Sequence, residues 1–273
     1  MDLQPDLLSV ILRLHTTEGQ ALSFLSQAIF SAVQSSYRPL EVLVVTQQFE
    51  VSQLRRIEQL LASFASGESC RLRTVNFQHP ERRDHRSALL NIGITAAKGR
   101  YLAFLDYDDF VYGEAYSTLI GQLRRSTAAA AFGGCVVAHA IPSAAGYKTV
   151  RKSQIWMDKQ EDDFLKGNIF PIHSFVIDRS RLKEALPRFN ENSCHMEDYE
   201  FLMHLRLVTA FDLTCWKQML VEYVVRDDGS NTLFVEEDQA TPAKLIAWRK
   251  SYATLGPLRR QVTEHVQRSA AAS

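Results

Sequence analysis

The hydrophobic pattern of the first half of the chain alternates between two periods. Short continuous apolar runs rich in β-branched residues predict buried strands, and apolar residues spaced three or four positions apart predict helices. The strands expected from this pattern span 7–14, 40–45, 72–77 and 101–105. The helices between them span 21–33, Val51 to near Gly67, and 87–97. Three strand–helix units in succession predict a parallel sheet with right-handed connections. The first half of the chain is therefore expected to be Rossmann-like.

The second half of the chain has a less regular pattern. No internal repeat or low-complexity linker divides it from the first half, so a single α/β domain is expected. Gly133-Gly134 predicts a bulge in a strand of small residues, the polar stretch 141–160 predicts a loop, and Gly99 is expected to cap a helix in the left-handed conformation. The other expected elements are helices at 114–125, from Ser180, from Glu197, at 243–252 and after Pro257, and strands at 128–140, 170–177 and 219–225.

Composition and charge narrow the class of protein. Of 273 residues, 46% are hydrophobic, which is enough for a substantial core. The 31 basic residues balance the 31 acidic ones, which argues against a nucleic-acid-binding surface. The four cysteines are widely spaced, without a C-x-x-C pair, and this favours a reducing cytoplasm. The sequence shows no signal peptide or membrane-spanning stretch, so we expect a cytoplasmic protein, at most peripheral at the inner face of a membrane.

Three carboxylates stand directly behind the strand expected at 101–105. They are Asp106, Asp108 and Asp109. In open α/β sheets, ligands bind at the carboxyl ends of the strands, where these acids would emerge. Asp106 and Asp108 are two positions apart on an extended segment and therefore point to the same side, where they could share a hard cation or a sugar diphosphate. Taken alone, this run of acids fits a turn with a helix cap equally well.

The segment from Leu90 to Asp109 closely resembles the central signature of family 2 glycosyltransferases, which have the GT-A fold. The likeness extends over about residues 7 to 235. Each matching segment is a weak signal alone, but together they follow the order of the family at about its spacing. The further segments are Ser9-Val10-Ile11-Leu12, Gln34-x-x-Tyr37-x-Pro39-Leu40-Glu41-Val42, Glu197-Asp198-Tyr199 and Gly229-Ser230-Asn231-Thr232.

The resemblance implies a GT-A type, Rossmann-like and mostly parallel sheet flanked by helices in a single domain. It implies a metal-dependent, inverting glycosyltransferase that moves a sugar from a nucleotide-sugar donor to a saccharide or lipid-linked acceptor, for instance in surface-polysaccharide assembly. The family's Asp-x-Asp segment, which falls on Asp106 and Asp108, holds Mg²⁺ or Mn²⁺ against the donor diphosphate. Asp106 would meet the ribose or share the metal, Asp108 would be the direct ligand, and Asp109 would support them. The cation would neutralise charge on the departing diphosphate.

Glu197 and Asp198 resemble the family's Glu-Asp pair, whose aspartate is the general base. The resemblance therefore gives Asp198 the task of deprotonating the acceptor hydroxyl in a single, inverting displacement. Acids at a helix start also simply complement the helix dipole, which lowers their pKa. Desolvation or the neighbouring Glu197 would have to offset that effect. Trp156, Asn168 and His173 are of types that contact sugars, although Trp156 also fits loop packing and His173 a structural role.

A basic loop precedes the third expected helix. Family members carry a basic residue a few positions before their Asn-x-Gly segment, which begins at Asn91 here. The resemblance therefore makes Arg86 the candidate for gripping a donor phosphate, with His85 next and Asn91 also in the donor site. For these residues, as for Arg82 and Arg83, a solvated charged loop is an equally good explanation.

Three segments depart from the family pattern. Val45–Gln48 stands where the family usually has Asp-Asp-Gly-Ser, so neutral groups such as Thr46 would contact the base of the nucleotide. Arg13–Thr16 replaces a common Pro-Thr-Tyr-Asn, which leaves His15 to border the base. Arg226–Asp228 replaces a frequent histidine-containing segment and so weakens the case for a metal ligand there.

Two other functions fit parts of the sequence. The missing Asp-Asp-Gly-Ser stretch would suit a degenerate, non-catalytic nucleotide-sugar-binding or scaffolding protein. A sugar-phosphate nucleotidyltransferase shares the architecture, but no Gly-rich phosphate loop with a lysine follows the first strand, where Gly19 stands alone. We expect the glycosyltransferase domain to span 1–240, with a nucleotide-sugar-binding half at 1–110 and an acceptor-facing half at 111–240, followed by a helical extension at 241–273.

Overall fold

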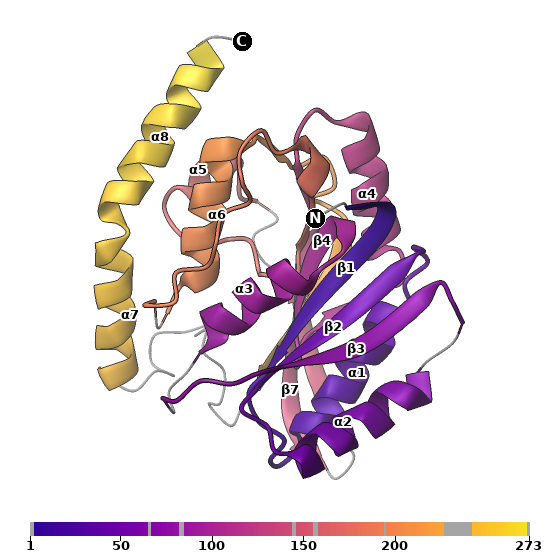
Figure 1. Ribbon diagram of the computed structural model, residues 1–273. Helices are drawn as coiled ribbons and strands as arrows, with labels where there is room; N and C mark the ends of the chain where they lie inside the picture. The colour runs from indigo at the N-terminus through magenta and orange to yellow at the C-terminus, as the bar shows by residue number, and fades with distance from the viewer. Residues whose placement is uncertain are drawn as a thin grey trace.

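Seven strands form the main sheet of the molecule. They are β1 (Gln4–Leu14), β2 (Leu40–Gln47), β3 (Cys70–Phe77), β4 (Gly99–Asp106), β6 (Ala130–Phe132), β9 (Phe175–Asp178) and β10 (Phe211–Asp212). Their order in the sheet is β10-β6-β9-β4-β1-β2-β3 (Figure 1). The computed structural model describes residues 3–64, 67–81, 85–143, 146–154, 158–193, 195–226 and 242–271.

The strands β3, β2, β1 and β4 run parallel, as the pattern of the first half predicts. They are joined by α1 (Ala21–Val33), α2 (Val51–Phe64) and α3 (Arg86–Ala96). α1 and α3 match the predicted helices to within one residue, and α2 is shorter than the helix predicted to end near Gly67. From β1 the chain adds β2 and β3 on one side and then crosses to add β4 on the other. The carboxyl ends of β1 and β4 therefore flank the point where the strand order reverses, which is where open α/β sheets bind ligands.

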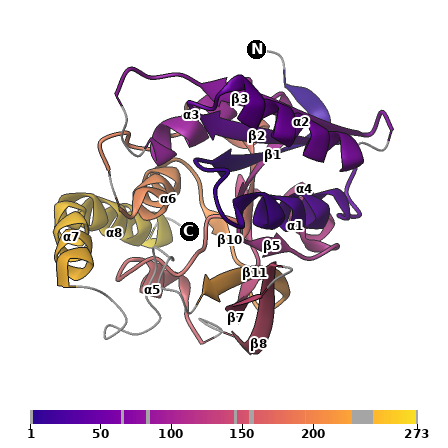
Figure 2. The ribbon, with the colours of Figure 1, turned by 90° about the horizontal axis from the view of Figure 1, so that it is seen from below.

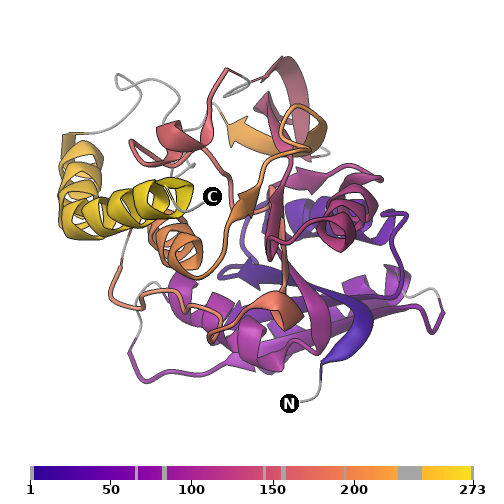
Figure 3. The same cartoon turned by 90° about the horizontal axis from the view of Figure 1, so that it is seen from above.

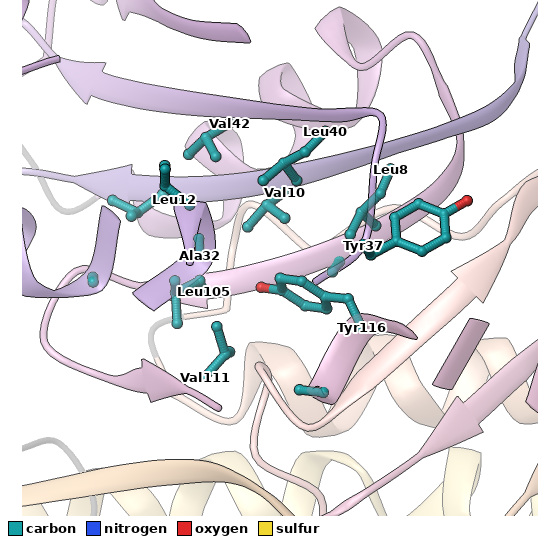
Figure 4. Packing of buried hydrophobic residues seen from close by; sticks show 14 of the residues in the cluster. Leu8, Val10, Leu12, Ala32, Tyr37, Leu40, Val42, Leu105, Val111 and Tyr116 are labelled. Atoms are coloured by element: carbon teal, nitrogen blue, oxygen red, sulfur yellow. The ribbon is translucent and has the colours of Figure 1, made fainter. Parts of the chain in front are cut away.

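Both faces of the main sheet are covered, which explains the continuous apolar runs of its central strands. Leu8, Val10 and Leu12 of β1 belong to one core, together with Ala32 of α1 (Figure 4). That core also includes residues of α2 and α4 (Ala115–Arg125). Ile11, which lies between them in sequence, belongs to a second core with residues of α3 and α6 (Glu197–Val208). The alternation along β1 thus divides its side chains between the two faces.

A smaller sheet of four strands lies beside the main one (Figure 2). Its strands, in spatial order, are β5 (Phe110–Val111), β11 (Met219–Arg226), β7 (Gly134–Ser143) and β8 (Gly146–Gln154). β5 follows the acid segment 106–109 immediately and pairs antiparallel with β11, with Val111 opposite Val221. This pairing brings the end of β11 next to the acids.

The single strand predicted at 128–140 is divided between the two sheets. β6 pairs with β9 in the main sheet, whereas β7 pairs with β11 in the smaller one. Gly133 N donates to Ser174 O at 2.8 Å, and Gly134 N donates to Gln218 O at 2.8 Å. A Cβ at either glycine would lie within 2.6 Å of a neighbouring atom. The glycine pair is therefore the crossing point between the sheets, and the ladder of β7 with β11 shifts its register next to Gly134, between Met219 and Val221.

Two further predictions in the second half are corrected. The loop predicted at 141–160 contains an edge strand, β8, which pairs antiparallel with β7. Its lysines and arginine are typical of edge strands, and this polar composition hides the strand from the hydrophobic pattern. The strand predicted at 170–177 is shorter, because Ser174 N donates to Pro171 O at 2.9 Å and a turn occupies its first part.

Gly99 is the first residue of β4 and does not have a positive φ, so the predicted helix cap at this glycine is wrong. Its role is close packing against β1. An added Cβ would lie 2.5 Å from Leu7 O and 2.8 Å from Ser9 N. A glycine is needed here because backbone atoms of the neighbouring strand leave no room for a side chain.

We therefore expect Gly99→Ala to lower the free energy of unfolding by about 1–3 kcal/mol, because β1 cannot move away without disturbing the sheet. Gly167→Ala is the matched control, since nothing lies within 4 Å of its added Cβ and its φ is not positive. Urea denaturation of both variants measures the difference. Equal stability of the two variants would contradict the close approach of β1 to Gly99.

Two helices, α7 (Pro242–Thr254) and α8 (Gly256–Ala271), follow β11 and confirm the helices predicted there (Figure 3). Leu255 and Val262 are buried in the same core as α6. The Tyr252 hydroxyl donates to Lys166 O, in the segment between α5 (Glu161–Phe164) and β9. The short helix expected from Ser180 is a 3-10 turn, η1 (Arg179–Arg181). Within the described ranges, no helix combines the length and apolarity needed to cross a membrane.

Candidate functional site

Two charged side chains face each other at the carboxyl ends of β1 and β4. The parallel register places Arg13 opposite Asp106. The guanidinium binds both carboxylate oxygens, with Nε 2.6 Å from Oδ1 and Nη2 3.0 Å from Oδ2. Such a bidentate pair fixes the position and the plane of the carboxylate. Burial would raise the pKa of Asp106, but the charge of Arg13 outweighs burial and holds the pKa below its ordinary value.

The same guanidinium also reaches the first turn of α6. Its Nη1 lies 2.7 Å from Oε1 of Glu197, and Nη1 of Arg86 lies 3.9 Å from that oxygen. The side chains of Arg13 and Glu197 are only 16% and 5% exposed. Burial lowers the pKa of Arg13, but the two carboxylates outweigh it and raise the pKa well above the ordinary value. One permanently charged arginine therefore joins the acids at the end of β4 to those at the start of α6.

Asp198, the second residue of α6, has a pKa close to neutrality. Burial raises the pKa to about 7, and the negative charge of Glu197 adds to this effect. The carboxylate is held at both oxygens, because Nδ2 of Asn168 donates to Oδ2 and Tyr199 N donates to Oδ1, each at 2.8 Å. The helix begins directly after Met196, whose φ of 62° is left-handed. Burial and Glu197 thus offset the effect of the helix N-terminus, and the carboxylate is suited to accept a proton near pH 7.

The other two acids of the cluster are tied to β11. Arg226, the last residue of β11, donates through Nη1 to Oδ2 of Asp108, and its side chain is 6% exposed. Asp109 accepts from Val224 N at 3.0 Å and lies 3.1 Å from Nδ1 of His173. Burial raises the pKa of Asp108 and of Asp109, while burial lowers the pKa of His173 to about 4. Asp109 and His173 are therefore interior residues that support the strand end.

Two of the residues predicted to bind the donor are accessible at this edge. His15 is exposed, and its ring meets the ring of Tyr107 edge to face, with centroids 5.8 Å apart. Arg86 opens α3 and is partly exposed. His85, the second phosphate candidate, is buried, with Nε2 3.0 Å from Glu81 O. Some predicted positions lie outside the described residues, namely Arg82, Arg83, Trp156 and Gly229 to Thr232.

Two other predicted donor contacts point into the protein. Thr46 is fully buried, and its hydroxyl donates to Oδ1 of Asn76 at 2.9 Å. Asn91 ties α3 to the segment before α6, since its amide donates to Phe189 O and accepts from Phe189 N, each at 2.9 Å. Both side chains use their polar atoms for internal hydrogen bonds. Their placement therefore gives no support to the predicted contact with the donor.

Sequence reasoning missed the roles of Arg13 and Arg226, which it treated only as replacements for residues of the family. Arg13 is the last but one residue of β1 and Arg226 is the last residue of β11. Each of them pairs with an acid of the cluster. A usable signal was present for Arg13, because an arginine and an aspartate stand at the carboxyl ends of two strands that were expected in one parallel sheet. Arg226 offered no comparable signal, since the position of β11 depends on the second sheet.

The carboxylates predicted to hold Mg²⁺ or Mn²⁺ do not fit a divalent cation in this arrangement. Such ions need oxygen ligands, but Asp106 and Asp108 already pair with arginines. In the described part of the chain, no three Asp, Glu, His or Cys side chains are grouped so as to hold a metal ion. A cation bound by these carboxylates would have to displace the guanidinium of Arg13 from Asp106 and that of Arg226 from Asp108. The metal-ligand role of these residues stays a prediction.

Solved structures of two glycosyltransferases share the fold. TarS of S. aureus, residues 1–349 in complex with UDP, is similar with a TM-score of 0.55 and 16% identity over 80% of this chain and 60% of that one. The same protein with UDP-GlcNAc gives a TM-score of 0.56 and 15% identity over 81% and 59%. The mannosyltransferase PcManGT of Pyrobaculum calidifontis, with GDP-Man and Mn²⁺, gives a TM-score of 0.56 and 14% identity over 97% and 75%. This chain thus spans about 60% of the length of TarS 1–349.

At such low identity these likenesses establish the fold, which is the GT-A fold that the sequence resemblance implies. Comparison of the sequence with curated proteins gave no match. The family model described as Glycosyl transferase family 2 matches residues 18–182, a stretch that includes α3, β4 and the acid cluster. Because that stretch is more than half of its length, the chain belongs to glycosyl transferase family 2.

Proposed function

We propose that this chain transfers a sugar from a nucleotide-sugar donor to a hydroxyl group of an acceptor, with inversion at the anomeric carbon. The observation that carries the proposal is the placement of Asp198. This carboxylate has a pKa of about 7 and is joined through Glu197 and Arg13 to the acid cluster. Membership of the family supports the reaction class. The complexes of TarS with UDP and UDP-GlcNAc and of PcManGT with GDP-Man support a nucleotide-sugar donor.

In the proposed reaction the donor lies against the half of the chain at 1–110, with Arg86 near its phosphates, and the acceptor lies against 111–240. Asp198 takes the proton of the acceptor hydroxyl while that oxygen bonds to the anomeric carbon. The bond from the anomeric carbon to the diphosphate oxygen breaks, and the nucleoside diphosphate leaves with the electron pair. A single displacement of this kind inverts the configuration. Asn168 and Tyr199 N favour the ionised form of Asp198 and fix its direction.

The remaining parts of the proposal rest on the family resemblance. We propose a saccharide or lipid-linked acceptor, in surface-polysaccharide assembly at the cytoplasmic side of a membrane. The complex of PcManGT with Mn²⁺ supports assistance by a divalent cation in that protein. Among the described residues, the positive groups next to the cluster include the guanidinium groups of Arg13, Arg86 and Arg226.

We expect the transfer rate to follow the ionisation of Asp198. Its pKa is raised to about 7 by burial, so the protonated, inactive form predominates below that pH. The value of kcat/KM should therefore rise about tenfold per pH unit below pH 7 and level off above it, because only the carboxylate accepts a proton. Release of nucleoside diphosphate from a panel of UDP-, GDP- and dTDP-sugars, followed across this pH range, measures the profile.

A matched control is Glu200→Gln on the same helix. Glu200 accepts from Asn190 at 3.0 Å and lies outside the acid cluster, so its profile should equal that of the parent. If the protein bound nucleotide sugars but released no nucleoside diphosphate at any pH, the proposal would fail and a non-catalytic binding protein would be favoured.

A further inference from the structure

We propose that the C-terminal helices take part in the transfer, and that Tyr252 of α7 is a positioning residue for the base Asp198, acting through the segment that carries Asn168. The inference rests on the proposed function, because it concerns how that base is held. Both helices lie outside residues 18–182, which the family model matches. The family match therefore gives these helices no role.

Asn168 is the residue through which α7 would act. Its side-chain amide is held at both ends, since Nδ2 donates to Oδ2 of Asp198 at 2.8 Å and Oδ1 accepts from Phe170 N at 3.0 Å. Phe170 is fully buried and packs against the rings of Phe132 and Phe164. This buried neighbour fixes which way the amide faces. The NH₂ group is thereby directed at the carboxylate.

The chain just before Asn168 contains a glycine, Gly167. The turn that ends α5 reaches as far as this glycine, because Lys166 N and Gly167 N donate to Asp163 O at 3.0 and 3.2 Å. Beyond it, the direction of the chain depends on the backbone angles of Gly167, and glycine has the widest choice of these angles. The turn alone therefore does not determine where the amide of Asn168 lies.

Tyr252 holds the peptide group that precedes this glycine. Its hydroxyl donates to Lys166 O, the carbonyl of the peptide bond between Lys166 and Gly167. A second tyrosine hydroxyl, from Tyr199 of α6, donates to Phe164 O at 2.7 Å. The segment is therefore held from two helices, by α6 at residue 164 and by α7 at residue 166. Because the tether from α7 is the one next to the glycine, it has the greater effect on the amide that follows.

Tyr252 is itself fixed by its neighbours in the two C-terminal helices. Its ring stacks on that of Trp248, with an interplanar angle of 8° and centroids 5.5 Å apart, and Cζ of Arg259 lies 3.9 Å from the centre of its ring. Such aromatic and cation–π contacts restrict the ring. Leu255 and Val262 attach the same two helices to the core that contains residues of α6 (Figure 2). The position of the hydroxyl therefore follows the packing of these helices on α6.

Tyr252→Phe removes the hydroxyl and keeps the ring, so it tests the tether without loss of packing. Release of nucleoside diphosphate is followed with the UDP-, GDP- or dTDP-sugar that turns over fastest. We expect kcat to fall about two- to tenfold, because one hydrogen bond that orients the amide is lost. The dissociation constant of that donor, measured by calorimetry, should stay the same. Tyr37→Phe is the matched control, since Tyr37 also donates to a backbone carbonyl, Asp6 O at 2.6 Å, near the amino end of β1, and it should keep the parental kcat.

Asn168→Ala gives the decisive comparison. This variant removes the side-chain donor to Asp198 and should lower kcat about tenfold or more. If Tyr252 acts through Asn168, adding Tyr252→Phe to this variant should change kcat no further, because two residues that act through one contact are not additive. A structural effect of α7 that is independent of Asn168 would instead multiply with the first loss and would overturn the inference.

The pH profile gives a third readout. A hydrogen bond from Asn168 favours the ionised form of Asp198. The charges that act on this carboxylate belong to Glu197, Arg13 and Asp106, which neither single variant alters. The inflection of kcat/KM should therefore lie at higher pH in Tyr252→Phe and in Asn168→Ala than in the parent. An inflection at the parental pH in both variants would contradict the role of the amide.

Hydrogen exchange distinguishes failure of this inference from failure of the proposed function, because it needs no turnover. Exchange at Phe170 N, measured by NMR, should be faster in Tyr252→Phe than in the parent and unchanged in Tyr37→Phe. Faster exchange together with a parental kcat would reject the inference and keep the transfer reaction. Parental exchange and a parental kcat would reject the tether itself. Faster exchange in a protein that releases no nucleoside diphosphate from any donor would support the tether and reject the transfer reaction.

Discussion

Replacement of Asp198 by asparagine is expected to lower kcat by about 10²–10⁴-fold, because an amide cannot accept the proton of the acceptor hydroxyl. The substitution conserves the shape of the side chain, and its one remaining oxygen can accept one of the two hydrogen bonds, from Asn168 or from Tyr199 N. The cluster at the ends of β1, β4 and β11 is unchanged. We therefore expect the dissociation constant of the donor, measured by calorimetry, to stay the same while single-turnover transfer is lost.

Unchanged donor affinity together with lost transfer distinguishes a general base from a residue that only shapes the site. A structural role for Asp198 would weaken donor binding or stability together with the rate. Transfer by Asp198→Asn at the parental rate would show that another group takes the proton. The variant should also lose the rise of rate through pH 7, since that rise belongs to the carboxylate of Asp198.

Replacement of Arg13 by methionine is expected to lower the free energy of unfolding by about 3–5 kcal/mol, because two nearly buried carboxylates lose their partner. Asp106 and Glu197 are only 22% and 5% exposed, so water cannot replace the guanidinium fully. Urea denaturation at neutral pH measures the loss. Transfer should fall as well, since Arg13 is the residue that holds β4 and α6 together.

The triple variant Arg13→Met, Asp106→Asn, Glu197→Gln is the control for charge. It removes the unpaired charges and should regain most of the lost stability, but not the activity.

The contribution of the ion pair to stability depends on pH with a definite sign. The pKa of Asp106 is lowered in the folded parent, so its pairing stabilises the protein above the unfolded pKa of about 3.9 and is lost as pH falls further. The difference between the parent and Arg13→Met should therefore shrink in acid, and a constant difference would argue against the ion pair.

The parallel part of the sheet could be predicted because its information is local. Strands buried on both faces show continuous apolar runs, and the apolar stripes of α1 and α2 begin and end where the helices do. The later strands could not be predicted in the same way. Whether the chain at Gly133 continues in one sheet or crosses to another depends on hydrogen bonds to Ser174 and Gln218, which are distant in sequence.

In the candidate site, too, the features that depend on residues distant in sequence could not be predicted. The acids at 106–109 and at 197–198 were found because they occur in short segments that resemble a family signature. Their partners were not, since Arg13 lies 93 residues from Asp106, and Arg226 lies 118 residues from Asp108. Local sequence therefore identified the carboxylates but not the charges that set their pKa. The internal hydrogen bonds of Thr46 and Asn91 likewise depend on residues outside their own segments.

The span of the bridge made by Arg13 also sets an order of events during synthesis. Arg13 and Glu197 are 184 residues apart. At about 5–20 residues per second, a ribosome needs about 10–40 s to make the intervening chain. In the later part of that interval, after Asp106 has been made, the chain contains the strands of the donor half but not the helix that carries Asp198. A newly made chain would thus contain the residues of the donor half before it contains Asp198. It could transfer a sugar only near the end of translation.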